Sequence, residues 1–190
     1  VSANTIYNGI DEYERILVMI KDEYIFDLFT IRDSSSHIYD WVQHRLDAIT
    51  LGGTGSSCSD TAGNSNGYEQ LTQVQCFTTS GSTITSESHS STNGGIKTFI
   101  IQQSGDKVLK AYAPGPDDIT SHPLYLIRRT ATNSQFSTIH SLNNGDSSYS
   151  VSSYSVLTGS PTSNLYSARI QSGSFNDDLI INRGSPISVT

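Results

Sequence analysis

The sequence predicts an all-β fold, an antiparallel β-sandwich, and three observations lead to this prediction. Serine and threonine supply 32 and 19 of the 190 residues, whereas charged residues make up only 15%, well below the roughly 25% of an ordinary soluble domain. The helix formers Lys, Glu, Ala and Leu are correspondingly few, which disfavours long solvated helices. Short strand-like runs recur at roughly ten-residue intervals, with Gly-, Asn- and Ser-containing turns between them. No change in composition divides the chain, so we expect one domain over residues 1–190.

Residues 13–20 and 22–30 predict the first two strands. The first run reads YERILVMI and is flanked by charge, while the second reads DEYIFDLFT and places apolar side chains on both faces. A short turn around Lys21-Asp22 joins them. A single helix over residues 11–31 is the alternative, but the density of Ile, Val, Tyr and Phe and the lack of an apolar stripe at helical spacing disfavour it.

A third alternating run, HIYDWVQH, follows a DSSS sequence that predicts a turn. In a strand, one face carries His37, Tyr39 and Trp41, and the other carries Asp40 and His44. The two histidines then point to opposite faces and can bind one metal ion only across a bulge or turn. Asp40 is placed to orient the His44 imidazole, and a purely structural role for the histidines is the alternative.

The rest of the chain predicts short strands separated by turns. Residues 52–67 read GGTGSSCSDTAGNSNG and predict a low-complexity loop without apolar side chains to bury. Turns are predicted at 104–106, 144–146 and 172–173. The remaining predicted strands are 71–78, 96–102, 107–112, 124–129, 134–141, 150–157, 165–170, 178–182 and 187–190.

Cys58 and Cys76 are the two cysteines, and we predict a disulfide between them because the composition resembles that of an extracellular protein. The bond closes a loop whose chain-entropy contribution is on the order of 3 kcal/mol. Two unpaired cysteines in polar strands are the alternative, and the absence of a CxxC pair disfavours zinc. Since no Asn-x-Ser/Thr acceptor occurs in this Ser/Thr-rich chain, we predict a bacterial protein, secreted or periplasmic.

The charge balance excludes some partners. The net charge of −7 argues against nucleic acid, because phosphate binding needs a basic face. No apolar run approaches the roughly 20 residues of a membrane helix and no signal peptide opens the chain, so no membrane partner is predicted. The sequence also lacks GxSxG, HExxH, P-loop and dinucleotide-binding signatures.

Two segments, in this order, resemble a known family. Residues 15–44 read RILVMIKDEYIFDLFTIRDSSSHIYDWVQH, similar to an Arg-led apolar strand, a Y-(apolar)-x-D-x-F strand and an H-x-Y-D-W-x-x-H motif. Residues 108–141 contain VLKAYAPGP, HPLYLIRR and SQFSTIHS, similar to an Ala-Pro-Gly turn, a strand ending in Arg-Arg and a Phe-x-Ser/Thr strand. The ordered set resembles the C-terminal β-sandwich of heparinase II/III-like polysaccharide lyases, a group that includes the alginate and oligoalginate lyases.

The resemblance implies a context for the chain. Lyases of this type join an α-helical toroid to a β-sandwich and cleave uronic-acid polysaccharides by β-elimination, with a Tyr or His base, groups that neutralise the substrate carboxylate, and a His/Asp/His metal site. The matching region begins downstream of those motifs. It therefore implies a non-catalytic module, inactive alone, that packs against the toroid catalytic domain and binds acidic, uronic-acid polysaccharide. The alternatives are a free-standing carbohydrate-binding module, a structural or adhesive surface domain, and a subunit that completes a lyase site with another chain.

Carbohydrate binding needs an exposed aromatic face with a few polar side chains around it. Trp41 is the only tryptophan and Tyr39 shares its predicted face, with a core position as the alternative for Trp41. Arg128-Arg129 would clamp a uronate carboxylate, unless they turn inward or pair with acids of neighbouring strands. Tyr39 as a base with His37 or Arg128 as neutraliser is conceivable, but no spacing requires it, so no catalytic residue is assigned. The candidate carbohydrate-binding residues are Tyr39, Trp41, His37, His44, Tyr125 and Arg128.

No cofactor is predicted apart from structural calcium. Asp117-Asp118 and Asp177-Asp178 lie near predicted turns, and carboxylate oxygens are ligands that calcium prefers. Acidic turn residues that are simply solvated are the alternative.

Overall fold

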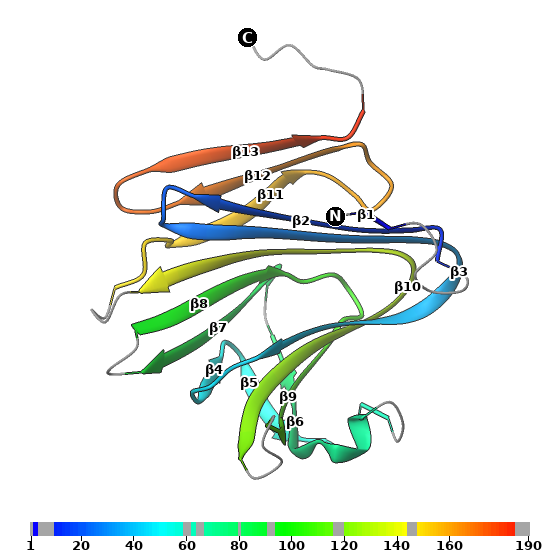
Figure 1. Ribbon diagram of the computed structural model, residues 1–190, viewed down its shortest axis with the longest axis vertical. Coiled ribbons are helices and arrows are strands. Elements are labelled where there is room, and N and C mark those ends of the chain that lie inside the picture. The colour runs from blue at the N-terminus through cyan, green and yellow to red at the C-terminus, as the bar shows by residue number, and fades with distance from the viewer. Residues whose placement is uncertain are drawn as a thin grey trace.

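Strands make up most of the chain that the structure describes, in two antiparallel sheets (Figure 1). The computed structural model describes residues 2–3, 10–58, 62–63, 67–79, 81–90, 94–115, 120–143 and 148–184. The only helical element in these residues is η1, a 3₁₀ turn at Tyr68–Gln70, and no helix among them is long and apolar enough to cross a membrane. The predicted all-β antiparallel sandwich is confirmed. The strands are β1 (Ser2–Ala3), β2 (Glu12–Ile20), β3 (Tyr24–His44), β4 (Ile49–Leu51), β5 (Thr54–Ser57), β6 (Thr72–Thr78), β7 (Thr83–Ser90), β8 (Gly94–Ile101), β9 (Lys107–Pro114), β10 (Ser121–Asn143), β11 (Ser153–Thr158), β12 (Leu165–Gln171) and β13 (Asn176–Asn182).

The first two strands form a hairpin, as the sequence predicts, and the helical alternative is wrong. β2 pairs with the first part of β3 from Ile20 opposite Tyr24 back to Glu12. Lys21 and Asp22 both have positive φ, 50° and 57°, which is the backbone of a type I′ turn. This turn twists in the same sense as the strands that it joins, so a two-residue connection suffices.

β3 and β10 are long strands that pair with each other along most of their length. The DSSS sequence is therefore not a turn, because it lies inside β3. The strands predicted separately at 124–129 and 134–141 are one strand, β10. Since each long strand runs through both halves of the larger sheet, the pair connects the regions that hold the core and the candidate site.

A bulge in β3 explains why the DSSS sequence does not end the strand. Arg32 pairs with Asn133 and His37 pairs with Ala131, so the residues between Arg32 and His37 lie opposite the one residue between Ala131 and Asn133. Asp33 supports the bulge, because its carboxylate accepts the backbone N–H two residues later at 2.8 Å and its own N–H donates to the Asn133 side chain at 3.3 Å. These bonds replace ladder hydrogen bonds, and the strand resumes beyond them.

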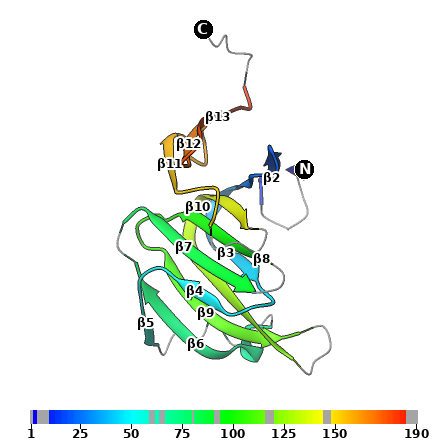
Figure 2. The same cartoon turned by 90° about the vertical axis from the view of Figure 1, so that its left-hand side faces the viewer.

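The larger sheet divides along β10 and curls. The N-terminal half of β10 pairs with β9 and its C-terminal half with β8, while β3 lies on its other side. From β8 the sheet continues to β7 and β4, and from β9 to β6 and β5; Figure 2 shows both branches on one side of the molecule. The enclosed core draws on the long strands and both branches: Ile31, Tyr39, Trp41, Ile49, Leu51, Ile84, Ile100, Val108, Tyr125, Ile127 and Phe136.

The sequence does not predict β4, β5 or β7. β7 reads TITSESHS, and of its inward-facing side chains only Ile84 is apolar. Ser86 and Ser88 are also buried, because the Ser86 hydroxyl donates to Tyr125 Oη at 2.7 Å and the Ser88 hydroxyl to a backbone carbonyl at 3.5 Å. Hydroxyl groups that find such distant partners can occupy inward positions, and the local pattern does not reveal them.

The three-stranded sheet β11–β12–β13 packs on the outer face of β2, β3 and β10 (Figure 1). Its strands match the predictions at 150–157, 165–170 and 178–182, whereas 187–190 and the turn at 144–146 lie outside the described residues. The second core, between the sheets, contains Tyr24, Phe26, Leu28, Phe99, Ile139, Val151, Tyr154, Tyr166, Ala168 and Ile170.

The Ser/Gly-rich stretch covers the outer face of the other half of the larger sheet. The prediction that residues 52–67 bury nothing is wrong, because Cys58 and the buried Ala62 pack there and β5 lies within this stretch. A disulfide joins Cys58 to Cys76, with their Cα atoms 5.5 Å apart. The buried residues of this third cluster are Ala62, Leu109, Ala111, Ala113, Leu124 and Leu126.

Removing the disulfide by Cys58→Ser with Cys76→Ser is expected to lower the free energy of unfolding by about 3 kcal/mol. The bond spans a sequence separation of 18, and a loop of about that length restricts the unfolded chain by roughly this amount. Urea unfolding followed by circular dichroism measures the change, and the reduced wild-type chain should match the double variant. An unchanged urea midpoint would contradict this expectation.

Candidate anion-binding cleft

The aromatic residues predicted to form a sugar-binding face lie in the core. Tyr39, Trp41 and Tyr125 are 6%, 5% and 0% exposed. The Trp41 ring lies 5.7 Å from the Tyr125 ring and stacks on His140 at 6.4 Å between centroids. The prediction of an exposed platform is therefore wrong, and the alternative of a core position for Trp41 is correct. Burial and the charge of Asp33 also raise the pKa of Tyr39, which disfavours the phenolate that a catalytic base requires.

Arg128 and Arg129 do not form a free clamp, because each already binds a carboxylate of the protein. Arg128 donates to both oxygens of Asp40, its cross-strand partner, at 2.8 and 2.6 Å. Arg129 donates to both oxygens of Asp106 at 2.7 Å. Tyr68 also donates to Asp40, so Asp40 is occupied and does not orient His44 as the sequence suggested.

The two candidate histidines of β3 are exposed and lie apart. His37 is 3.2 Å from the Asp33 carboxylate at the bulge. His44 lies at the other end of the HIYDWVQH segment and on the opposite face, as its spacing predicts. The structure therefore does not bring them together at one site.

The acidic pair of β13 is engaged in other interactions. Asp177 accepts a hydrogen bond from Tyr24 Oη at 3.0 Å, and Asp178 binds Arg169 through both oxygens at 2.7 and 2.8 Å. Neighbouring residues of a strand point to opposite faces, so these two carboxylates do not share one ion. Among the described residues no cluster of three or more His, Cys, Asp or Glu is placed to hold a metal, and Asp117-Asp118 lie outside them.

Arg45, which the sequence did not single out, has the most unusual environment of the arginines. The other six each form an ion pair with a carboxylate. Arg45 is 9% exposed, and in the described part of the chain no carboxylate forms an ion pair with it. Its Nη2 donates to Thr98 Oγ1 at 2.7 Å. This arginine is therefore a buried cation whose countercharge the described residues do not supply.

Burial without a countercharge is costly for a cation. Burial lowers the pKa of the Arg45 guanidinium, and the nearby Tyr125 and Tyr149 hydroxyls offset only part of that effect. Charges taken from water are stabilised only when a partner of opposite charge and good geometry accompanies them. The planar guanidinium offers that partner a fork of N–H donors that fits a carboxylate or a sulfate.

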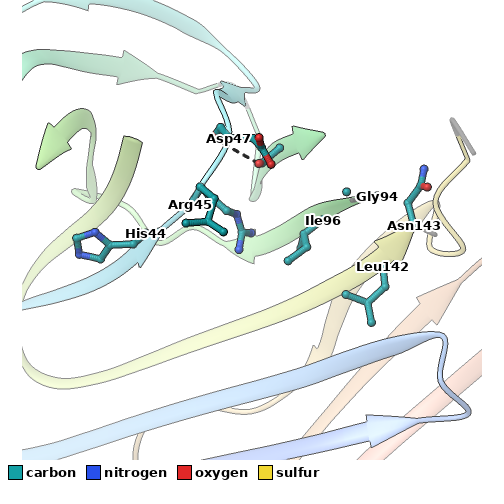
Figure 3. A pocket seen from close by; sticks show the side chains of 10 residues that line it. His44, Arg45, Asp47, Gly94, Ile96, Leu142 and Asn143 are labelled. Atoms are coloured by element: carbon teal, nitrogen blue, oxygen red, sulfur yellow. Dashed lines mark hydrogen bonds between the residues drawn. The ribbon is translucent and has the colours of Figure 1, made fainter. Parts of the chain in front are cut away.

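A cleft lies beside Arg45. Two cavities of about 420 Å³ each share His44, Arg45 and Leu46 as lining residues. The first, here called the Asn143 cavity, is also lined by β7, β8 and the end of β10; in Figure 3 the Arg45 side chain points toward β8 in this cavity and the His44 ring points away from it. The second, the His122 cavity, also contains Pro114, Gly115 and His122. The cleft thus combines one unpaired cation with neutral hydrogen-bonding groups.

Buried polar side chains hold Arg45 in place from behind. Thr98 Oγ1, which accepts from Arg45, is 3.0 Å from His140 Nδ1, and His140 Nε2 is 3.9 Å from Asp27 Oδ2. Asp27 binds Arg15 through both oxygens, at 3.0 and 2.8 Å. Burial alone would raise the pKa of Asp27, but His140 and Arg15 outweigh burial and lower it, so this carboxylate is ionised at neutral pH. A network of this kind fixes the position of Thr98 and, through it, the Arg45 fork.

Comparison with known proteins identifies the fold. No family model matches the sequence, and no curated protein matches it. The crystal structure of heparinase III has a TM-score of 0.59 at 11% identity, over 94% of this chain and 24% of that one. The crystal structure of a mutant of the heparan sulfate lyase HepC from Pedobacter heparinus has a TM-score of 0.59 at 6% identity, over 93% of this chain and 24% of that one. This chain spans about a quarter of the length of each, and it has the fold of that portion of these lyases.

Proposed function

We propose that the chain is the β-sandwich module of a heparinase-like polysaccharide lyase and that it binds an acidic polysaccharide at Arg45. The observation that carries the proposal is the buried Arg45 guanidinium, unpaired with any described carboxylate, on the wall of an open cleft. The fold likeness supports the context, since the similar structures are named as a heparinase and a heparan sulfate lyase. The motifs at residues 15–44 and 108–141 support the same context.

The charge distribution makes the binding local. The net charge is −7, and six of the arginines are neutralised by carboxylates of the protein itself. A broad electrostatic grip on a polyanion is therefore not available. A single carboxylate or sulfate group bound to Arg45 needs no such field, because the interaction is short-range and partly desolvated.

The module is non-catalytic in this proposal. The one tyrosine considered as a base, Tyr39, is buried and has a raised pKa. Chemistry then belongs to an α-helical catalytic domain against which the sandwich packs. A secreted or periplasmic bacterial location accords with the Cys58–Cys76 disulfide, since such bonds persist in oxidising compartments.

Affinity electrophoresis of the chain through gels containing heparan sulfate, alginate or neutral dextran tests the proposal. We expect the two acidic glycans to retard the chain and dextran to leave its mobility unchanged. Added salt should weaken the retardation, because the anion is held by a charge-assisted contact. If neither acidic glycan retards the chain, or dextran retards it equally, the proposal is wrong.

A further inference from the structure

We infer that the cleft takes an internal stretch of a linear acidic glycan, with the acidic unit at Arg45 and a neighbouring sugar on each side. The inference rests on the proposed function and adds how the polymer is bound. Its ligands are chains of three or more units, and single sugars are poor ligands for the cleft.

The position of Arg45 between two cavities is the first argument. The Asn143 cavity and the His122 cavity share only the segment His44–Leu46 and extend from it to different strands. Each has a volume of about 420 Å³, within the roughly 300–1,000 Å³ of small-molecule sites. A site that selected chain ends would be closed on one side of its charged group. Here space continues on both sides.

Closely packed backbone in both cavities is the second argument. A Cβ added at Gly95 would lie 2.7 Å from Tyr149 Oη, and one added at Gly115 would lie 2.5 Å from His122 Cδ2. Glycine therefore lets the backbone of each cavity wall approach its neighbours closely. Walls fixed in this way form both cavities before a ligand arrives, so little ordering cost accompanies binding.

The chemistry of the flanking surfaces is the third argument. The Asn143 cavity offers Asn143 and Ser88 side chains, and the His122 cavity offers the His122 imidazole, as partners for sugar hydroxyl groups. Leu46, between the cavities, is 83% exposed and presents an apolar surface to the C–H face of a sugar ring. The charge is thus recognised once, at the centre, and the neighbours are recognised through hydroxyl and C–H groups.

Isothermal titration calorimetry with D-glucuronate and with alginate and heparan sulfate oligosaccharides of two to six units tests the inference. We expect the affinity to rise at least tenfold from glucuronate to the four-unit chains and then to level off. His122→Ala and Asn143→Ala should each lower the affinity for six-unit chains three- to tenfold, so that the gain with length shrinks in both variants. Arg169→Gln, at an exposed ion pair on the small sheet, is the matched control and should bind like the wild type.

The outcomes separate this inference from the proposed function. If the polymers are retained in an Arg45-dependent way but affinity does not depend on length, or only one of the two variants loses affinity, the internal binding mode is wrong and the module proposal stands. If no glycan of any length binds, both are wrong. Circular dichroism of each variant establishes that the comparison is between folded chains.

Discussion

Asp106→Asn is expected to lower the free energy of unfolding by about 3–5 kcal/mol, the cost of removing one partner of a buried ion pair. The side chains of Arg129 and Asp106 are only 4% and 0% exposed. Both carboxylate oxygens accept from the guanidinium at 2.7 Å, and the guanidinium lies 4.4 Å from the centre of the Phe136 ring. The neutral amide would leave the Arg129 charge buried without its countercharge.

Urea unfolding measures this loss, and the chain supplies a matched control. Asp178→Asn removes a carboxylate from a bidentate pair of the same geometry that is about half exposed, so stability should hardly change. Adding Arg129→Met to Asp106→Asn should recover part of the loss, because the uncompensated charge is then gone. If Asp106→Asn and Asp178→Asn have equal effects, the buried pair does not hold the strands as described.

Trp41→Ala is expected to cost about 3–5 kcal/mol, in the range observed for truncating large buried aromatic side chains. Trp41 fills the space between Tyr125 and His140 inside the curled sheet, and no flexible side chain is available to close the cavity. Glycan affinity of the folded fraction should stay near the wild-type value, because the indole does not reach the cleft.

Circular dichroism is the appropriate probe for this variant, because the substitution removes the only tryptophan. Trp41→Phe is the conservative comparison and should recover much of the stability. A Trp41→Ala chain that kept its stability and lost its glycan affinity would return Trp41 to the role of an exposed platform.

The sequence predicts the parts of this fold that local alternation determines. Tyr39 and Trp41 point inward as their spacing requires, and the β2–β3 hairpin follows from its apolar runs. The DSSS sequence misleads, because the side chain of Asp33 satisfies a bulge that sequence pattern alone reads as a turn. β7 is invisible in the sequence, since its buried serines depend on partners far along the chain.

The candidate site is harder to predict, because its defining property is a relation between distant residues. Arg128 and Arg129 stand out in the sequence as a pair, yet both are neutralised by acids of other strands. Arg45 is a single arginine one residue beyond the HIYDWVQH motif. Only the fold shows that it is buried and that, among the described residues, it has no acidic partner.

The measurement that tests the central claim most directly is the pair of effects of Arg45→Met on glycan affinity and on stability. We expect affinity for heparan sulfate and alginate oligosaccharides to fall at least about tenfold, since hydrogen bonds to a charged group contribute about 1.5–3 kcal/mol. The free energy of unfolding should stay the same or rise, because an unpaired buried charge is replaced by an apolar chain of similar length. Arg169→Met, at the exposed pair, should change neither. A variant that kept its glycan affinity, or that lost stability in the way a structural arginine would, would contradict the assignment of Arg45 as an anion-binding residue.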